Sequence, residues 1–299
     1  MANYIGDTSL SEQEINMLQI MAEEKRGQFN IGTAPLGETI FKLVRQTGIQ
    51  LIYVPIEVEE DRSNTFSGMY ASFKQDGEKV FYIGINTYEY LDKQIFTLAH
   101  ELYHHWEDTE MCVCRNLEEP NGLGEQKANR FAAEFLLPTN KLKDEIILRT
   151  AGKSHLKEFD HLDLLRFIAR LHCDYRLPYK AIVRRLQEIK AITEAQFTEL
   201  IQEPSRDEQS AYFKIGKNID PHVFKKLNTR TMEDGAEGDI PYEFIYCFKR
   251  EIVSRTELAD DLSLFGKELV DYDLEEEVSD QDLAELEGLF GGGMEDETK

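Results

Sequence analysis

The sequence contains a motif whose residue types and spacing could perform hydrolysis, the HExxH pentapeptide His100-Glu101-Leu102-Tyr103-His104. Histidines four residues apart lie on one face of a helix, so both imidazoles can reach the same zinc ion. Glu101 follows the first histidine, which places its carboxylate beside the metal without making it a ligand. It could then take a proton from a water molecule whose pKa the zinc lowers towards about 7. The motif predicts a zinc hydrolase site with Glu101 as catalytic base.

Two surface histidines on a charged helix could produce the same pentapeptide by chance, because short motifs recur in unrelated sequences. The residues before the motif argue against that reading. Phe96, Leu98 and Ala99 would bury the helix, as a precisely positioned metal site requires. We therefore expect a helix over residues 91–107 that packs in the protein interior.

A catalytic zinc site needs a third protein ligand and one open position. The metzincin pattern is excluded, because Glu107 and Glu110 stand where that pattern has Gly and His. Glu125, at the start of the next helical segment, is the better candidate, although an acidic residue also stabilises a helix N-terminus without any metal. Asn129 lies one turn later on the same face, where its amide could orient a ligating histidine.

The elements that must position these residues follow from hydrophobic periodicity and turn signals. Helical patterns occupy residues 11–26, where Ser11 and Glu14 form a possible capping box, and residues 36–47, 91–107 and 125–137. Segments rich in β-branched and aromatic residues, typical of strands, lie at 51–56, 66–73 and 80–85, with a turn signal at 75–78. The sequence thus predicts an α+β domain with a small antiparallel sheet over residues 1–150.

The remaining half of the chain is predicted to be largely helical. Residues 158–202 contain two amphipathic patterns joined by a short turn at 173–176, which is the outline of a helix-turn-helix, and Thr193 caps a third helix. Residues 205–239 are polar and predicted to be irregular, and helices are expected near 241–250 and 254–266. We therefore divide the chain into the peptidase domain 1–150, a helix-turn-helix-like region 151–204, a C-terminal helical module 205–266 and a tail 267–299.

The 299 residues carry a formal net charge of −23. Direct nucleic acid binding is therefore not expected, since affinity for phosphates comes from Lys and Arg, and a basic partner is favoured. Residues 267–299 alone carry 13 acidic and 2 basic residues, which predicts a mobile acidic tail. No signal peptide, disulfide framework or apolar run of about 18 residues is evident, so we expect a cytoplasmic protein without a membrane span.

The segments FTLAHELYHHWED and EQKANRFAAEFLLP together resemble the ImmA/IrrE family of zinc metallopeptidases, which pairs HExxH with a downstream ExxAN-FAA block. The lead-in YIGINTYEYLDKQIFTLAHE is also similar, and the likeness extends over about residues 35–140. The resemblance implies a zincin-like (gluzincin-type) fold and one Zn²⁺ per chain. It makes His100, His104 and Glu125 zinc ligands and Glu101 the catalytic base. Two residues depart from the family pattern without touching a proposed ligand, namely Tyr103 and Phe135.

The resemblance also implies a substrate class. Family members typically cleave and inactivate helix-turn-helix transcriptional repressors of phage, mobile-element or stress regulons, and DNA-binding repressors tend to be basic. We expect such a substrate to lie extended along an edge strand of the sheet. The alternative is a non-proteolytic anti-repressor with a structural or degenerate metal site. A structural zinc site normally closes its fourth position with Cys or His, so the intact HExxH favours the peptidase.

Several other residues and segments could have either a functional or a purely structural role. His105 is expected to hydrogen-bond locally or face solvent instead of binding metal. Cys112 and Cys114 are expected to be a buried pair on a strand or loop, although they could offer thiolates. The helix-turn-helix outline is expected to be a scaffold or docking surface, not a DNA reader. The tail could be a solvated segment or could mimic the charge of DNA. Weaker candidates for the third zinc ligand are Asp108 and Glu134.

Overall fold

The computed structural model describes residues 10–57, 66–75, 78–108, 111–115, 122–236, 240–250, 252–263 and 267–274. Contacts divide the chain into two units, Met1–Gly238 and Asp239–Lys299. The predicted boundaries after residues 150 and 204 both fall inside the first unit. The division of the chain into four functional segments therefore stays a prediction.

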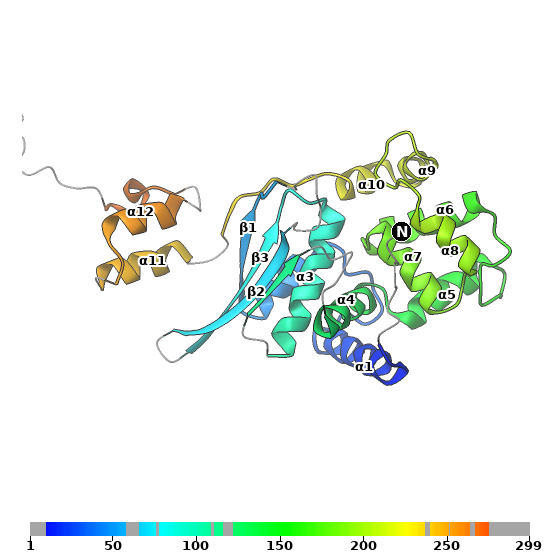
Figure 1. Ribbon diagram of the computed structural model, residues 1–299, viewed down its shortest axis with the longest axis horizontal. Coiled ribbons are helices and arrows are strands. Elements are labelled where there is room, and N and C mark those ends of the chain that lie inside the picture. The colour runs from blue at the N-terminus through cyan, green and yellow to red at the C-terminus, as the bar shows by residue number, and fades with distance from the viewer. Residues whose placement is uncertain are drawn as a thin grey trace, which may run out of the picture. The chain divides into compact units, whose positions relative to one another are not determined.

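A five-stranded mixed sheet forms one layer of the first unit (Figure 1). Its strands lie in the order β4 (Met111–Arg115), β2 (Phe66–Gln75), β3 (Glu78–Asn86), β1 (Ile49–Val54) and β5 (Gly235–Ala236). Strands β2 and β3 form the predicted hairpin and pair antiparallel, with Tyr70 opposite Ile83. Strand β4 pairs antiparallel with β2 and β5 with β1, whereas β1 runs parallel to β3.

The prediction of a wholly antiparallel sheet was wrong at the pairing of β1 with β3, where Leu51 lies opposite Ile83. Alternation of apolar residues predicts which face of a strand is buried, but it contains no information on the direction of the neighbouring strand. After β1 the chain crosses to the far side of β3 before it forms β2, so β3 separates two strands that follow each other in sequence. The β5 pairing joins segments about 180 residues apart, which no local pattern reveals.

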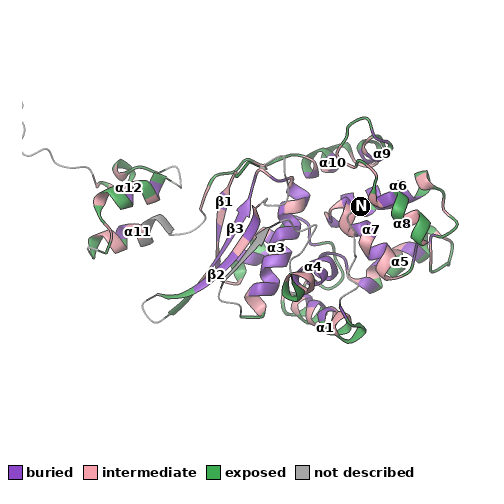
Figure 2. Cartoon of the chain, in the orientation of Figure 1, coloured by how far each residue is buried: buried purple, intermediate pink, exposed green. Residues whose placement is uncertain are grey.

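Helix α3 (Leu91–Trp106), which contains the HExxH motif, packs against β2 and β3. From Leu91 to His104 all of its residues except Lys93 are buried, as the buried colouring of α3 in Figure 2 shows. On its other side α3 contacts α4 (Leu123–Leu136), and α4 in turn contacts α1 (Glu12–Gln28). The predicted capping box of α1 is confirmed, and the predicted second helix is α2 (Thr39–Gln46).

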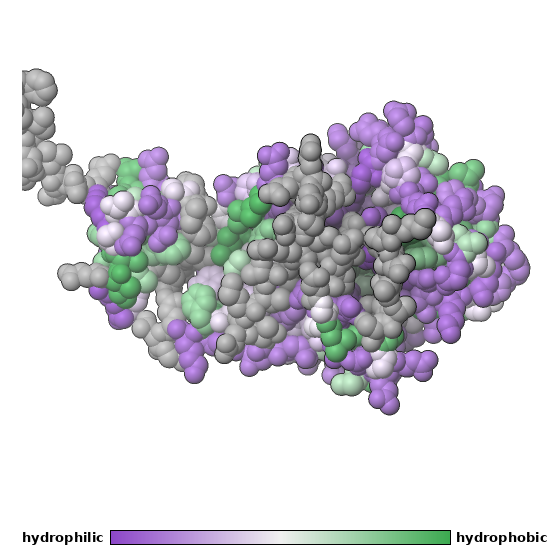
Figure 3. Space-filling view, in the orientation of Figure 1, coloured by the Kyte–Doolittle hydropathy of each residue, from purple (hydrophilic) through white to green (hydrophobic). Residues whose placement is uncertain are grey.

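Helices complete the first unit: α5 (Thr139–Arg149), α6 (His161–Tyr175), α7 (Tyr179–Glu188), α8 (Glu194–Ile201), α9 (Ala211–Ile219) and α10 (Pro221–Leu227). The predicted helix pair is α6 and α7, and Thr193 forms a capping box with Gln196 at the start of α8. The turn between α6 and α7 lies at residues 176–178, slightly later than predicted, with Arg176 in the left-handed conformation at φ 62°. Figure 3 shows mainly hydrophilic side chains over the exposed faces of α5, α6 and α8.

The prediction of an irregular segment over 205–239 was wrong, because α9 and α10 lie within it. Ser210 caps α9 through the N–H of Phe213, and Asp220 caps α10, which begins with Pro221. The two helices bury Tyr212, Phe224 and Leu227 in the core of the first unit. Each helix is only two to three turns long, so few apolar residues mark its period, and tertiary packing supplies most of its stability.

The second unit contains α11 (Ile240–Lys249), α12 (Arg255–Ser263) and the short 3₁₀ helix η2 (Leu269–Tyr272). Ile245, Leu258 and Leu262 form its own small apolar cluster. The two helices agree with those predicted near 241–250 and 254–266. Most of the predicted acidic tail, residues 275–299, lies outside the described residues. No helix among the described residues is long and apolar enough to cross a membrane.

Candidate metal centre

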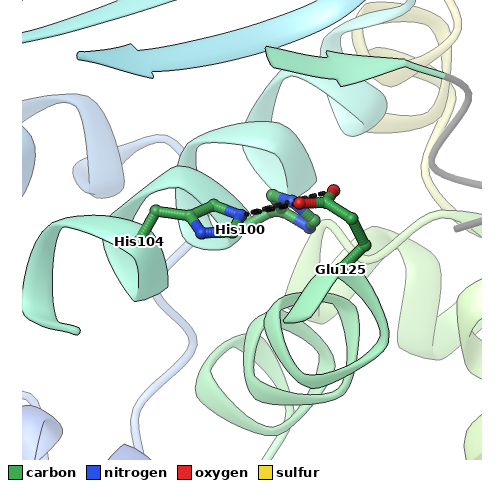
Figure 4. Close-up of side chains that lie close together, drawn as sticks. All are labelled: His100, His104 and Glu125. Carbon is green, nitrogen blue, oxygen red and sulfur yellow. Dashed lines mark hydrogen bonds and ion pairs between the residues drawn. The ribbon is translucent and has the colours of Figure 1, made fainter. Parts of the chain in front are cut away.

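Helices α3 and α4 bring His100, His104 and Glu125 together (Figure 4). One ligand atom from each residue lies within 4.8 Å of the other two. Glu125 Oε2 is 3.2 Å from His100 Nε2, and Glu125 Oε1 is 3.3 Å from His104 Nε2. The two Nε2 atoms are themselves 3.2 Å apart. Two imidazoles from one helix and a carboxylate from the next therefore face a common point.

The burial of α3 favours the neutral form of His100. His100 is completely buried and His104 is 5% exposed. Burial lowers the pKa of His100, although the adjacent carboxylate of Glu125 opposes this effect. A neutral imidazole has a lone pair available for a metal ion, whereas an imidazolium has none.

The amide of Asn129 fixes the orientation of His100. Its Oδ1 atom lies 2.8 Å from His100 Nδ1. A carbonyl oxygen can only accept a hydrogen bond, so Nδ1 must carry the proton and Nε2 the lone pair. That lone pair is on the nitrogen that faces Glu125. A hydrogen bond of this kind is the usual support of a metal-binding histidine.

The donor set fits a catalytic zinc ion. Zinc binds imidazole nitrogen and carboxylate oxygen, and catalytic sites use three protein ligands and keep one position open. The three donors here are held by the convergence of two helices, and two of them are buried. No other group of three His, Cys, Asp or Glu residues converges in this way in the described part of the chain.

Glu101, which follows His100 in α3, is fully buried where strand β2 passes close to the helix. A Cβ atom at Gly68 of β2 would lie 3.0 Å from Glu101 Oε1 and would collide with the side chain of Thr97. Only glycine therefore allows the strand to approach the helix so closely. Gly68 was not predicted as a site residue, because its only signal in the sequence is an isolated glycine in a strand pattern.

The weaker candidates for the third ligand lie elsewhere. Asp108 is exposed and forms an ion pair with Lys79. Glu134 is buried, but its carboxylate is bound by Arg130 and Arg185, with Glu134 Oε2 at 2.9 and 2.7 Å from their guanidinium nitrogens. Neither residue belongs to the group formed by His100, His104 and Glu125.

His105 hydrogen-bonds locally, as expected, with Nδ1 3.3 Å from the hydroxyl oxygen of Tyr70. Its ring also lies edge-on to that of Phe81, with centroids 4.7 Å apart. Cys112 and Cys114 belong to strand β4, but their side chains lie outside the described part of the structure. The prediction that they form a buried pair therefore stays untested.

Comparisons with known proteins place these residues in context. Residues 45–187 match the sequence model of the Peptidase_M78 family, described as the IrrE N-terminal-like domain. No curated protein matches the sequence. One similar solved structure is a Mycobacterium tuberculosis transcriptional regulator, with 17% identity and a TM-score of 0.33. The match covers 61% of this chain and 47% of the transcriptional regulator. This chain therefore spans about half the length of the regulator.

Proposed function

We propose, from the match of residues 45–187 to the Peptidase_M78 family of IrrE N-terminal-like domains, that the protein is a zinc-dependent endopeptidase. Its substrate in this proposal is a helix-turn-helix transcriptional repressor of a phage, mobile-element or stress regulon, which cleavage inactivates. The observation that supports it most strongly is the convergence of His100, His104 and Glu125 next to a buried Glu101. A glutamate from a second helix as third ligand makes the arrangement zincin-like, of the gluzincin type.

In this proposal His100, His104 and Glu125 hold one zinc ion. When bound, zinc supplies a Lewis acid that polarises the scissile carbonyl and lowers the pKa of water. Glu101 accepts a proton from the attacking water molecule while the oxygen of that water forms a bond to the carbonyl carbon. The same carboxyl group then passes that proton to the amide nitrogen as the C–N bond breaks. The products are a new carboxyl terminus and a free amine.

The surroundings of the site suggest how a repressor would be held. Strand β4 ends the sheet next to β2, and an edge strand can bind an extended peptide by main-chain hydrogen bonds. The net charge of −23 favours a basic partner. Helices α6 and α7 bury their apolar faces, including Ile168 and Leu186, in the core of the first unit. A packing role for this helix pair is therefore a better explanation than DNA reading.

Removing one proposed ligand tests the metal site. Elemental analysis of the wild-type protein, purified without added metal, is expected to find about one zinc per chain, and His104→Ala should lose it because a two-ligand site binds zinc poorly. His105→Ala is the matched control on the same helix and should retain the metal. Absence of metal from the wild type would instead favour a non-proteolytic anti-repressor.

Asn129→Ala tests the proposed support of His100. We expect the affinity for zinc to fall about 10–100-fold, because the imidazole loses the hydrogen bond that sets its tautomer and orientation. Competition with a zinc chelator measures this change. Lys127→Ala is the control on the same helix, since Lys127 pairs with Glu14 at 3.0 Å and is not a member of the group. Equal affinities of the Asn129 variant and the wild type would show that the amide does not support the ligand.

A further inference from the structure

A cavity of about 410 Å³ in the first unit is lined in part by residues of α3 and β2, the helix and strand that meet at Glu101. Phe96 lines the cavity one helical turn before His100, so the two residues lie on the same face of α3. Ser67 of β2 also lines it and directly precedes Gly68, which approaches the Glu101 carboxylate. The β2–β4 pairing is irregular at Ser67, and a bulge of this kind can redirect a side chain. One wall of the cavity thus lies about one helical turn from His100.

The charge of the cavity is opposite to that of the chain. Five cationic residues line it, namely Lys93, Lys180, Arg184, Arg206 and Arg230, against three acidic ones, Glu89, Glu203 and Asp207. In a chain of net charge −23 such a local excess of cations is unexpected. The volume is in the range of ordinary ligand pockets, so the cavity can accept one or two side chains of a peptide.

Several of these charges have partners within the protein. Arg206 Nη2 lies 2.6 Å from both carboxylate oxygens of the buried Asp92. Lys93 Nζ lies 3.5 Å from Glu89 Oε1. Glu203 Oε2 lies 3.4 Å from His161 Nε2. These contacts account for Arg206, Lys93, Glu89 and Glu203, and Lys180 and Arg184 also interact with other groups of the protein.

Arg230 differs, because it forms no ion pair with any described residue. Its guanidinium lies 4.0 Å from the ring centre of Tyr88 and 5.5 Å from that of Tyr90. The guanidinium of Arg206 lies 4.3 Å from the same Tyr90 ring, so two cations share one aromatic side chain. The backbone holds Arg230 there through a bridge to Tyr90. An exposed guanidinium fixed at a cavity wall is suited to bind a carboxylate.

We propose that this cavity is a substrate subsite that selects an acidic residue, Asp or Glu, near the scissile bond, with Arg230 binding its carboxylate. Aromatic side chains, including Tyr90 and Phe96, contact the aliphatic part of the bound residue. A Lys or Arg in the same place would meet a local excess of positive charge. The inference rests on the proposed peptidase function and deepens it, since it names a sequence preference of that site.

Peptide selection on a catalytically disabled protein tests the subsite. A degenerate peptide library is passed, in low-salt buffer, over immobilised zinc-loaded Glu101→Gln protein, and the bound peptides are sequenced. We expect Asp and Glu to be enriched about tenfold at one position, since a charge-assisted hydrogen bond contributes at least that factor. The net charge of −23 attracts basic peptides non-specifically, so acidic selection cannot arise from it.

Three further substitutions in the Glu101→Gln background make the test specific. Arg230→Gln should abolish the enrichment, whereas Arg230→Lys should preserve part of it because the charge remains. Arg250→Gln in the second unit is the matched control, since Arg250 also lies over a tyrosine ring, at 4.3 Å from that of Tyr246, and it should leave the enrichment unchanged. Enrichment of Lys or Arg, absence of any enrichment, or equal enrichment after Arg230→Gln would overturn the proposal.

Cleavage of the same library by the zinc-loaded wild type separates this inference from the proposed function. Cleavage without an acidic preference would refute the subsite and leave the peptidase standing. Acidic selection in the binding experiment without any cleavage would refute the peptidase and leave an acid-selective cavity. Selective binding and selective cleavage at the same position would support both.

Discussion

Replacing Glu101 by glutamine is expected to lower the rate of peptide hydrolysis about 10²–10⁴-fold, the usual contribution of a general acid–base group. Glutamine has nearly the same shape as glutamate but cannot accept the proton of the attacking water. Because Glu101 is not one of the proposed ligands, zinc content and the midpoint of thermal unfolding should stay at wild-type values. Mass spectrometry of a degenerate peptide library incubated with zinc-loaded protein measures the rate.

Glu107→Gln provides the matched control for this substitution. Glu107 is an exposed residue at the C-terminal end of the same helix, and the change there should leave hydrolysis unaffected. In cells, Glu101→Gln should still bind its partner but fail to relieve repression. Full relief of repression by the variant would contradict a proteolytic mechanism and favour the non-proteolytic anti-repressor.

The candidate site could be predicted in unusual detail because its spacing follows from helix geometry. His100 and His104 lie one turn apart in α3. Glu125 and Asn129 lie one turn apart in α4. Two helices therefore position all four residues. Local sequence determines each of these helices. The structure brings the three proposed ligands together, and the family match agrees with the resemblance seen in the same motifs.

The features that the sequence analysis missed all depend on contacts between distant segments. The approach of Gly68 to Glu101 joins β2 to α3, and the cavity joins Arg230 to Tyr90 across about 140 residues. Neither is visible in a local pattern, because a glycine in a strand or an arginine in a polar stretch has many possible roles. The parallel pairing of β1 with β3 was missed for the same reason. Chain direction is a property of the assembled sheet.

Loss of the buried Glu134 carboxylate should destabilise the protein more than any surface substitution. It accepts hydrogen bonds from Arg185, 2.7 Å away on α7, and from Arg130, 2.9 Å away on its own helix. The N–H of Thr139 adds a third at 2.6 Å. Arg130 and Arg185 are at most 2% exposed, so Glu134→Ala leaves buried positive charge with less compensation. Breaking a buried pair in this way costs about 3–5 kcal/mol.

Chemical denaturation at pH 7 measures the free energy of unfolding, and Glu158→Ala is the control. Glu158 pairs with Lys153 at the surface, where an ion pair contributes little to stability, so its removal should leave the denaturation midpoint unchanged. The zinc content of the folded Glu134→Ala protein should also be unchanged, because Glu134 is bound by arginines and not by the metal. Loss of zinc without loss of stability would show instead that Glu134 is a ligand.

The pH dependence of unfolding provides a further check on the Glu134 cluster. Burial alone would raise the pKa of Glu134, but the charges of Arg185 and Arg130 and the hydrogen bonds from Thr139 lower it below its ordinary value. A carboxyl group with a lowered pKa in the folded state stabilises that state fully above its unfolded pKa of about 4.3, and this stabilisation is lost as the pH falls further. The difference in stability between the wild type and Glu134→Ala should therefore be largest near neutral pH and should shrink below about pH 4. A difference independent of pH would mean that packing, and not charge, determines the contribution of Glu134.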